Sequence, residues 1–269
     1  MFRWLPLLWL SLAPAFVQGA VEPRAIETRT LEYRQGDTRL VGYLAYPKDL
    51  KAARPGVLVV HEWMGLNDYA KRRAEQLAEL GYVALAADIY GDGKIAADTQ
   101  EAGALAGQYK KDRALLRARV AAGLAALKAQ PHVASNQLAA IGYCFGGTTV
   151  LELARSGADV AGVVSFHGGL DSPAPQDARN IRGKVLALHG ADDPYVPADQ
   201  VAAFEQEMSA GSVDWQLIAY GGAVHGFTNP ANGSDNQKGV AYNAKADQRS
   251  WLAMQQFFAE LFGPGQNAP

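Results

Sequence analysis

The chain has 269 residues, of which 49% are hydrophobic, and its formal net charge is −2. This length and apolar content fit one large α/β domain, and the small net charge gives no basis for a nucleic-acid partner or an anionic membrane. A single cysteine excludes an internal disulfide and any cysteine-rich metal site.

The first twenty residues predict a secretory signal peptide. Arg3 precedes an apolar run over residues 4–17, and the small residues Gly19 and Ala20 mark a cleavage point. The run is too short and too interrupted by proline for a transmembrane helix, although an uncleaved membrane anchor is the alternative. We therefore expect an exported protein, periplasmic or secreted, with no membrane contact after cleavage, in which residues 21–269 form a single domain.

Strand patterns and helical patterns then alternate along the chain. Residues 27–33 and 38–46 predict a β-hairpin. Apolar strands are expected at 57–60, 82–87, 138–141, 160–166, 184–188 and 214–220. Helices are expected between them, except that residues 170–180 are expected to form a loop, and a last helix is expected at 245–262. An alanine-rich helical region reaching Lys128 is expected to break near Gly103 to Gly107. The alternation predicts an α/β fold with a mostly parallel sheet covered by helices on both faces.

A glycine-rich turn joins the strand at 138–141 to the following helix. Its sequence is Gly142-Tyr143-Cys144-Phe145-Gly146-Gly147, the form of a nucleophile elbow with cysteine in the place of serine. We interpret Cys144 as a nucleophile at a helix N-terminus, where free N–H groups favour a thiolate. A buried core cysteine is the alternative, and a thiol between glycines at a tight turn fits it poorly.

A cysteine nucleophile needs a base, and the base needs an orienting group. His225 follows the last predicted strand, and Asp193 follows the strand before it. This order of nucleophile, acid and histidine is that of α/β-hydrolases. Asp192 has the charge for the same role; Asp193 is preferred because Pro194 follows it in the turn.

Glu62 and Trp63 follow the strand at 57–60 and are further site candidates. The backbone N–H groups of Phe145, next to Cys144, and of Trp63 are candidates for an oxyanion hole. Glu62 is a candidate for tuning the thiol by charge or hydrogen bonding. A surface glutamate or an ion-pair partner is the alternative for Glu62. Of the remaining histidines, the three at strand ends are expected to bond the backbone and the last to be inert: His61, His167, His189 and His132. Their separation gives no metal-ligand spacing, so we expect no metal.

Six segments resemble the dienelactone hydrolase family of the α/β-hydrolase fold. They are His61 to Asn67, Asp88 to Tyr90, Gly142 to Gly147, Phe166 to Gly169, Asp193 to Pro197 and His225 to Phe227. The resemblance implies a catalytic triad of Cys144, Asp193 and His225, with Glu62 controlling the ionisation of the thiol. It also implies hydrolysis of an ester or lactone through an acyl-cysteine intermediate.

The chain departs from the dienelactone-cleaving members of that family in its substrate residues. Those members carry an arginine after the Asp-x-Tyr segment and another after the catalytic histidine. Here Gly91-Asp92-Gly93-Lys94 and Thr228-Asn229-Pro230 stand at these places, so Lys94 is the candidate replacement.

The sequence therefore predicts a monomeric hydrolase of small carboxylic esters or lactones that uses no cofactor. Two alternatives stay open: an acyltransferase or thioesterase with the same triad, and a small-molecule binding protein without turnover.

Overall fold

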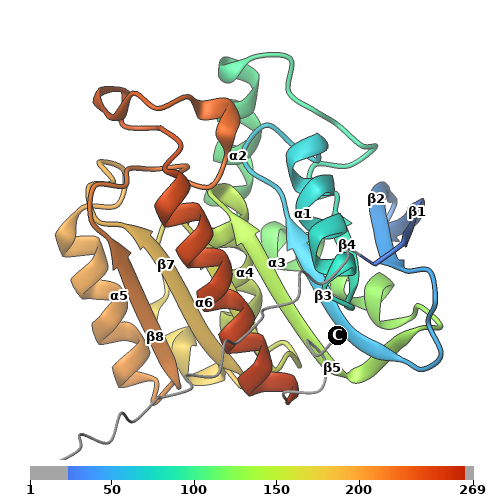
Figure 1. Cartoon of the computed structure of the whole chain (residues 1–269). Helices are drawn as coiled ribbons and strands as arrows, with labels where there is room; N and C mark the ends of the chain where they lie inside the picture. Colours follow the sequence, from blue (N-terminus) through green and yellow to red (C-terminus); the bar gives the residue numbers. More distant parts are fainter. Residues whose placement is uncertain (1–23, 264–269) are drawn as a thin grey trace, which may run out of the picture.

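The structure is a computed structural model that describes residues 24–263 (Figure 1). The predicted signal peptide lies outside these residues, as does most of the C-terminal tail. One sheet of eight strands, in the order β1-β2-β4-β3-β5-β6-β7-β8, organises the described chain. The strands are β1 (Ile26–Gln35), β2 (Thr38–Pro47), β3 (Arg54–Val60), β4 (Val83–Ala87), β5 (Val133–Tyr143), β6 (Gly162–Phe166), β7 (Lys184–Gly190) and β8 (Trp215–Tyr220).

The sheet is mostly parallel, as the alternation of strands and helices predicts. Strands β3 to β8 pair in parallel, while β1 and β2 form the expected antiparallel hairpin, in which Gln35 pairs with Thr38. Gly36 turns this hairpin with a φ of 55°, in the left-handed region that glycine enters at no steric cost. β2 joins the parallel part through antiparallel pairing with β4.

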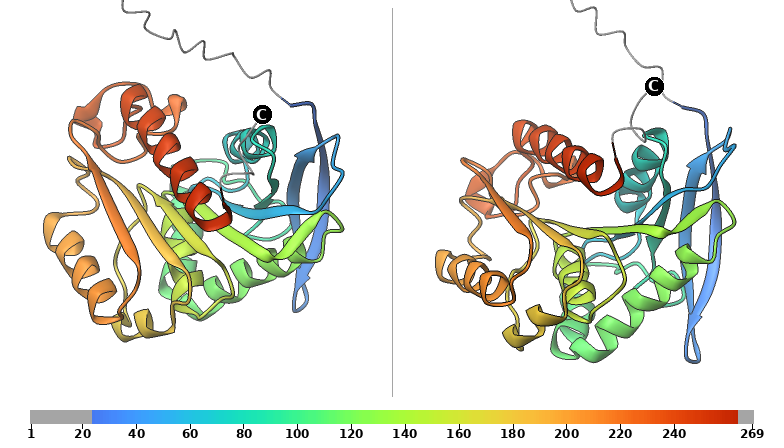
Figure 2. Two further views of the ribbon diagram at one scale, coloured as in Figure 1. Left: turned by 60° about the horizontal axis from the view of Figure 1, so that its bottom comes forward. Right: turned by 90° about the horizontal axis from the view of Figure 1, so that it is seen from below.

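Helices cover both faces of the sheet (Figure 2). α1 and α6 pack on one face, and α3, α4 and α5 lie on the other, with α2 beside α3. The helices are α1 (Asp68–Glu79), α2 (Thr99–Lys111), α3 (Arg113–Lys128), α4 (Phe145–Arg155), α5 (Ala198–Ala210) and α6 (Ala244–Phe262). Short 3-10 turns lie between them, one of which occupies part of a stretch expected to be a loop, Pro175–Asn180.

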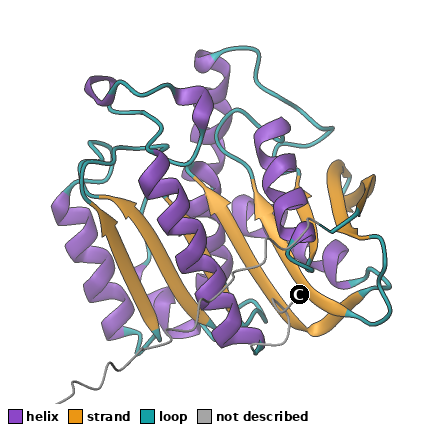
Figure 3. Ribbon diagram, in the orientation of Figure 1, coloured by secondary structure: helices purple, strands orange, loops and turns teal. Residues whose placement is uncertain are grey.

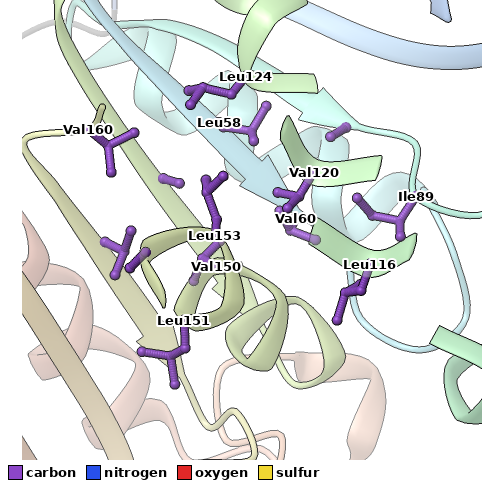
Figure 4. Close-up of a cluster of buried hydrophobic side chains, with 14 of the residues drawn as sticks. Leu58, Val60, Ile89, Leu116, Val120, Leu124, Val150, Leu151, Leu153 and Val160 are labelled. Atoms are coloured by element: carbon purple, nitrogen blue, oxygen red, sulfur yellow. The ribbon is translucent and has the colours of Figure 1, made fainter. Parts of the chain in front are cut away.

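Each face of the sheet has its own hydrophobic core. Along β3, Val57 and Val59 point into the core beneath α1 and α6, whereas Leu58 and Val60 point into the core beneath α3 and α4 (Figure 4). All four side chains are buried, which is the result of a two-residue period in a strand covered on both sides. Burial on both faces of the sheet therefore accounts for the continuous apolar run of β3 in the sequence.

The expected break at Gly103 to Gly107 is wrong, because both glycines lie inside α2. The chain instead changes direction at Asp112, whose carboxylate accepts the backbone N–H of Leu115 at 2.9 Å and so caps α3. A glycine costs a helix only about 1 kcal/mol, which does not end it without a capping residue to start the next one.

The parallel strands all end at one edge of the sheet, where long loops gather (Figure 3). The segments after β3, β5, β6, β7 and β8 meet there, and these carry the residues singled out in the sequence. No helix within residues 24–263 is long and apolar enough to cross a membrane.

Candidate active site

Cys144 occupies the sharp turn between β5 and α4. Its backbone has φ 53° and ψ −113°, a conformation that costs a non-glycine residue about 1–3 kcal/mol. The flanking glycines allow this turn, because a Cβ on Gly142 would lie 2.0 Å from the carbonyl oxygen of Gly146, and one on Gly146 would lie 2.2 Å from that of Val60. The start of α4 therefore packs in direct backbone contact with the neighbouring strand β3.

Three residues from different loops form a hydrogen-bonded line. His225 Nε2 lies 3.1 Å from Cys144 Sγ, and His225 Nδ1 lies 2.8 Å from Asp193 Oδ2. The other carboxylate oxygen of Asp193 accepts the backbone N–H of Tyr195 at 2.8 Å. Asp193 is buried, whereas Asp192 is exposed, so the structure brings Asp193 rather than its neighbour to the histidine.

The surroundings of His225 favour its charged form. Burial acts to lower its pKa, but the negative charge of Cys144 and the hydrogen bonds with Asp193 and Cys144 outweigh burial and raise the pKa to about 10. The raised pKa favours a proton on the imidazole that lies beside the sulfur.

Glu62 follows β3 and lines the same cavity as Cys144. Its side chain is almost wholly enclosed, and Asn229 Nδ2 donates to Glu62 Oε2 at 2.6 Å. Burial raises the pKa of Glu62, and the donor on Asn229 with the positive charges of His225 and Arg73 offsets that rise only in part. Glu62 is thus a buried carboxylate held by an amide, and neither a surface glutamate nor half of an ion pair.

The two candidate oxyanion donors, Phe145 and Trp63, follow the neighbouring strands β5 and β3. Phe145 is the first residue of α4, so the helix itself supplies no acceptor for its N–H. Trp63 lines the cavity with Cys144, and the hydroxyl of Tyr90 donates to the Trp63 carbonyl at 2.7 Å, which fixes this loop.

The thiol opens into a cavity of about 560 Å³. Its lining residues come from the segments after β3, β5, β6, β7 and β8 and from α2 and α5: Glu62, Trp63, Met64, Asn67, Lys110, Cys144, Gly169, Asp171, Tyr195, Val196, Gln200, His225, Gly226, Asn229, Ala231, Asn232 and Val240. Lys94, the expected replacement for a substrate arginine, is not among them and pairs with Glu101 at 2.7 Å. The lysine of the cavity wall is Lys110 on α2.

The remaining histidines differ in their contacts. His61 Nδ1 donates to its neighbour's carbonyl, that of Glu62, at 2.6 Å, and His167 Nδ1 accepts the backbone N–H of Cys144 at 3.1 Å. His189 departs from the expectation, because its buried Nδ1 has no hydrogen-bond partner in the structure. His132 is exposed. Among residues 24–263 no three His, Cys, Asp or Glu side chains are placed to hold a metal ion.

Sequence reasoning missed three residues of this site: Lys110, Tyr195 as a donor to Asp193, and Asn229 as the partner of Glu62. Asn229 lies 167 residues from Glu62 in the chain, so no local spacing predicts their contact. Its position four residues after His225 was the only signal available.

Comparison with known proteins gives this geometry a context. The model of the dienelactone hydrolase family matches residues 40–262. A solved dienelactone hydrolase-like promiscuous phosphotriesterase from metagenomic libraries is 46% identical, superposes with a TM-score of 0.84, and aligns over 89% of this chain and all of its own. A Synechocystis protein named "Putative carboxymethylenebutenolidase" is 30% identical over 87% of this chain and 96% of its own length.

A more distant structure defines the fold class. The acylaminoacyl peptidase of Pyrococcus horikoshii is 16% identical and superposes with a TM-score of 0.65 over 87% of this chain and 41% of its own. At that identity the likeness concerns the fold alone, and it matches the mostly parallel sheet with helices on both faces. Together with the family match over most of the described residues, it leads to one conclusion: the chain is a hydrolase that belongs to the dienelactone hydrolase family and has the α/β-hydrolase fold.

Proposed function

We propose that this protein hydrolyses small carboxylic esters or lactones, with Cys144 as the nucleophile. The observation that carries the proposal is the line from Cys144 Sγ through His225 to Asp193, with distances of 3.1 and 2.8 Å, in which Cys144 and His225 line the cavity. A thiol at a strained turn, a histidine charged by its surroundings and a buried carboxylate are the parts that acyl transfer needs.

In the acylation half-reaction, Cys144 Sγ attacks the carbonyl carbon of the substrate. The carbonyl oxygen becomes an oxyanion, for which the N–H groups of Phe145 and Trp63 are the candidate donors. The intermediate collapses, the C–O bond breaks, and the leaving oxygen takes the proton from His225 Nε2. The product is an acyl-cysteine and a free alcohol, or, from a lactone, an acyl-cysteine whose alcohol stays attached.

In the deacylation half-reaction, a water molecule attacks the thioester carbon and gives its proton to His225 Nε2. The C–S bond breaks, the acid leaves, and the thiolate reforms beside the imidazolium. Asp193 holds the imidazole with Nδ1–H toward its carboxylate, so that Nε2 faces sulfur and substrate in both halves.

The same acyl-cysteine serves other acceptors, so an acyltransferase or thioesterase remains a candidate. Phosphotriester hydrolysis is a second candidate, favoured by one finding: the structure that is 46% identical to this chain is described as a promiscuous phosphotriesterase. A thiolate that attacks phosphorus in place of carbon would use the same base and the same donors. A protein that binds ligand without turnover is the remaining alternative.

The test measures turnover of nitrophenyl esters, lactones and a nitrophenyl phosphotriester by the wild type and by Cys144→Ala. We expect Cys144→Ala to lose at least about a thousandfold in kcat, with only the residual rate that binding and the oxyanion donors supply. Full activity of Cys144→Ala on esters would overturn the mechanism. Added alcohol or thiol acceptors separate transfer from hydrolysis by their products.

We also infer, from the apolar segment at residues 4–17, that the protein is exported. The mature chain is proposed to act as a monomer in the periplasm or outside the cell. Fractionation of cells measures the location of the protein, and light scattering of the mature protein measures its oligomeric state. Recovery of the protein with an intact N-terminus in the cytoplasm would contradict export.

A further inference from the structure

A buried chain of polar side chains connects the backbone of Cys144 to helix α1. The backbone N–H of Cys144 donates to His167 Nδ1 at 3.1 Å, and His167 Nε2 lies 2.7 Å from Thr228 Oγ1. Thr228 Oγ1 lies 2.6 Å from the hydroxyl of Tyr69, which accepts from Arg73 Nε at 3.2 Å. The reaction scheme above uses none of these four side chains.

This chain fixes the tautomer of His167. The Cys144 N–H is shared between the Phe166 carbonyl oxygen, at 3.0 Å, and His167 Nδ1, at 3.1 Å. Since Nδ1 accepts this N–H, it carries no proton, and the neutral ring has its proton on Nε2. Nε2 therefore donates to the hydroxyl of Thr228. Burial, and then the positive charges of His225 and Arg73, hold the pKa of His167 well below its usual range, so the ring stays neutral.

Arg73 is the last residue of this row of hydrogen-bonded side chains, and several contacts hold it in place. Its guanidinium pairs with Asp247 of α6 at 2.5 Å and donates to the Thr228 carbonyl at 2.9 Å. It also lies over three aromatic rings, at 5.2–5.4 Å from their centres: Tyr69, Tyr143 and Trp251. The cation, with its carboxylate partner and three ring faces, is held in one place although it is almost fully buried.

The ring of His167 also forms one wall around the catalytic candidate His225. The two rings meet edge to face at 5.4 Å, and the ring of Tyr195 meets His225 in the same manner, also at 5.4 Å. The titratable and charged groups that face His167 are His225 from the loop after β8, Arg73 and Tyr69 from α1, and Tyr143 from β5. A second proton on His167 would repel the imidazolium and leave the Cys144 N–H with the Phe166 carbonyl oxygen as its remaining acceptor.

We propose that His167 is a positioning residue: as a neutral ring held by Thr228, Tyr69 and Arg73, it joins the Phe166 carbonyl in holding the Cys144 N–H at the elbow and sets one face of His225. This inference rests on the proposed triad for its effect on turnover. Its structural content is a neutral ring that has its proton on Nε2 and the Thr228 hydroxyl as the acceptor of that proton, and this is independent of which reaction the site performs.

The test uses Thr228→Val, which keeps the side-chain shape and removes the hydroxyl, beside Thr228→Ser, which keeps the hydroxyl. We expect Thr228→Val to lower kcat about tenfold with KM changed less than twofold, and Thr228→Ser to retain at least half of the wild-type kcat. The rate at which iodoacetamide alkylates Cys144 is also measured as a function of pH. The pH at which this rate rises should be higher in Thr228→Val and unchanged in the other variants. A buried-hydroxyl control is Thr149→Val, whose hydroxyl donates to the Phe145 carbonyl within α4 and touches neither histidine.

Two further readouts distinguish positioning from loss of folding. Nitrogen NMR of labelled histidines should show His167 as a neutral ring protonated on Nε2 from pH 5 to 9 in the wild type, and this pattern should be lost in Thr228→Val. Tyr69→Phe should act in the same direction, and the double variant should lose no more than Thr228→Val, because the two hydroxyls act as one unit. A wild-type pH profile in Thr228→Val, or equal losses in Thr149→Val, would overturn the proposal.

These outcomes separate two failures. If Cys144→Ala keeps full activity, the proposed function fails, yet the NMR pattern of His167 still tests the chain of hydrogen bonds without any substrate. If the triad is correct and Thr228→Val changes neither the pH profile nor the NMR pattern, only the positioning role fails.

Discussion

Two buried carboxylates stand at the ends of parallel strands in this site, and their surroundings are opposite. Asp193, after β7, has one oxygen on His225 and the other on the backbone N–H of Tyr195. Glu62, after β3, has one amide donor from Asn229 and a raised pKa, whose first cause is burial. Both are carboxylates after parallel strands, but Asp193 has a partner on each oxygen, whereas burial makes Glu62 costly to ionise.

Replacing the Asp193 carboxylate by an amide should have the largest effect on activity. Asp193→Asn is expected to lower kcat by about a thousandfold, because the amide no longer holds the imidazole in the required tautomer. The sign of the pH effect follows from the raised pKa of His225: the imidazolium persists until pH rises through about 10, and loss of the Asp193 charge lowers that limit. The alkaline limb of kcat/KM against pH should therefore move to lower pH. An unchanged limb would contradict the role of Asp193.

Removing the Glu62 carboxylate should lower activity less than removing that of Asp193, and it should raise the stability of the folded protein. Since the folded-state pKa of Glu62 is raised, ionising it destabilises the folded protein, and this penalty grows as pH rises from below 4.5 through the raised value. Glu62→Gln should therefore raise the melting temperature by about 2–4 °C at pH 7, which corresponds to about 1 kcal/mol. We expect kcat/KM to fall about tenfold, because the imidazolium of His225 loses a nearby negative charge. Calorimetry and kinetics on the same sample measure both.

A melting temperature of Glu62→Gln below that of the wild type would contradict the view that Glu62 is destabilising. Asp193→Asn serves as the matched control, since its carboxylate has a bond on each oxygen and its removal should lower the melting temperature. Opposite signs in the two variants are the result that this comparison requires.

The smallest expected effect concerns the amide that holds Glu62. Asn229→Asp keeps the acceptor for the backbone N–H of Ala231 and removes the donor to Glu62. Two facing carboxylates repel, so the variant should lose stability as pH rises through the range in which both ionise. We expect less than a fivefold loss of kcat/KM at pH 7, measured together with the melting temperature at pH 5 and pH 8. A melting temperature with the same pH dependence as the wild type would show that the amide does not support the charge.

Much of the fold is predictable because simple periodicities decide it. The apolar run of β3 is buried on both faces. Because parallel strands end at one edge of the sheet, the residues that follow them, Cys144, Asp193 and His225, are expected to lie near one another. The choice of Asp193 over Asp192 followed from Pro194 in the sequence, and the structure places only Asp193 in contact with His225.

What the sequence could not predict depends on contacts across long separations. Lys94 and Lys110 both carry the right charge, and only the path of α2 shows which one reaches the cavity. Similarly, the break between α2 and α3 at Asp112 depends on a carboxylate capping the next helix, while the glycines at 103 and 107 stay in the helix. The partnership of Asn229 with Glu62 needed the packed loops.

The central claim is that Cys144 carries the acyl group. Mass spectrometry of the protein, quenched in acid within the first turnovers of a slowly deacylated nitrophenyl ester, tests it most directly. We predict a mass increase equal to one acyl group, located on the peptide that contains Cys144 and absent in Cys144→Ala quenched at the same time. Turnover of the ester with no acylated peptide at Cys144, or with the acyl group on another residue, would contradict the account.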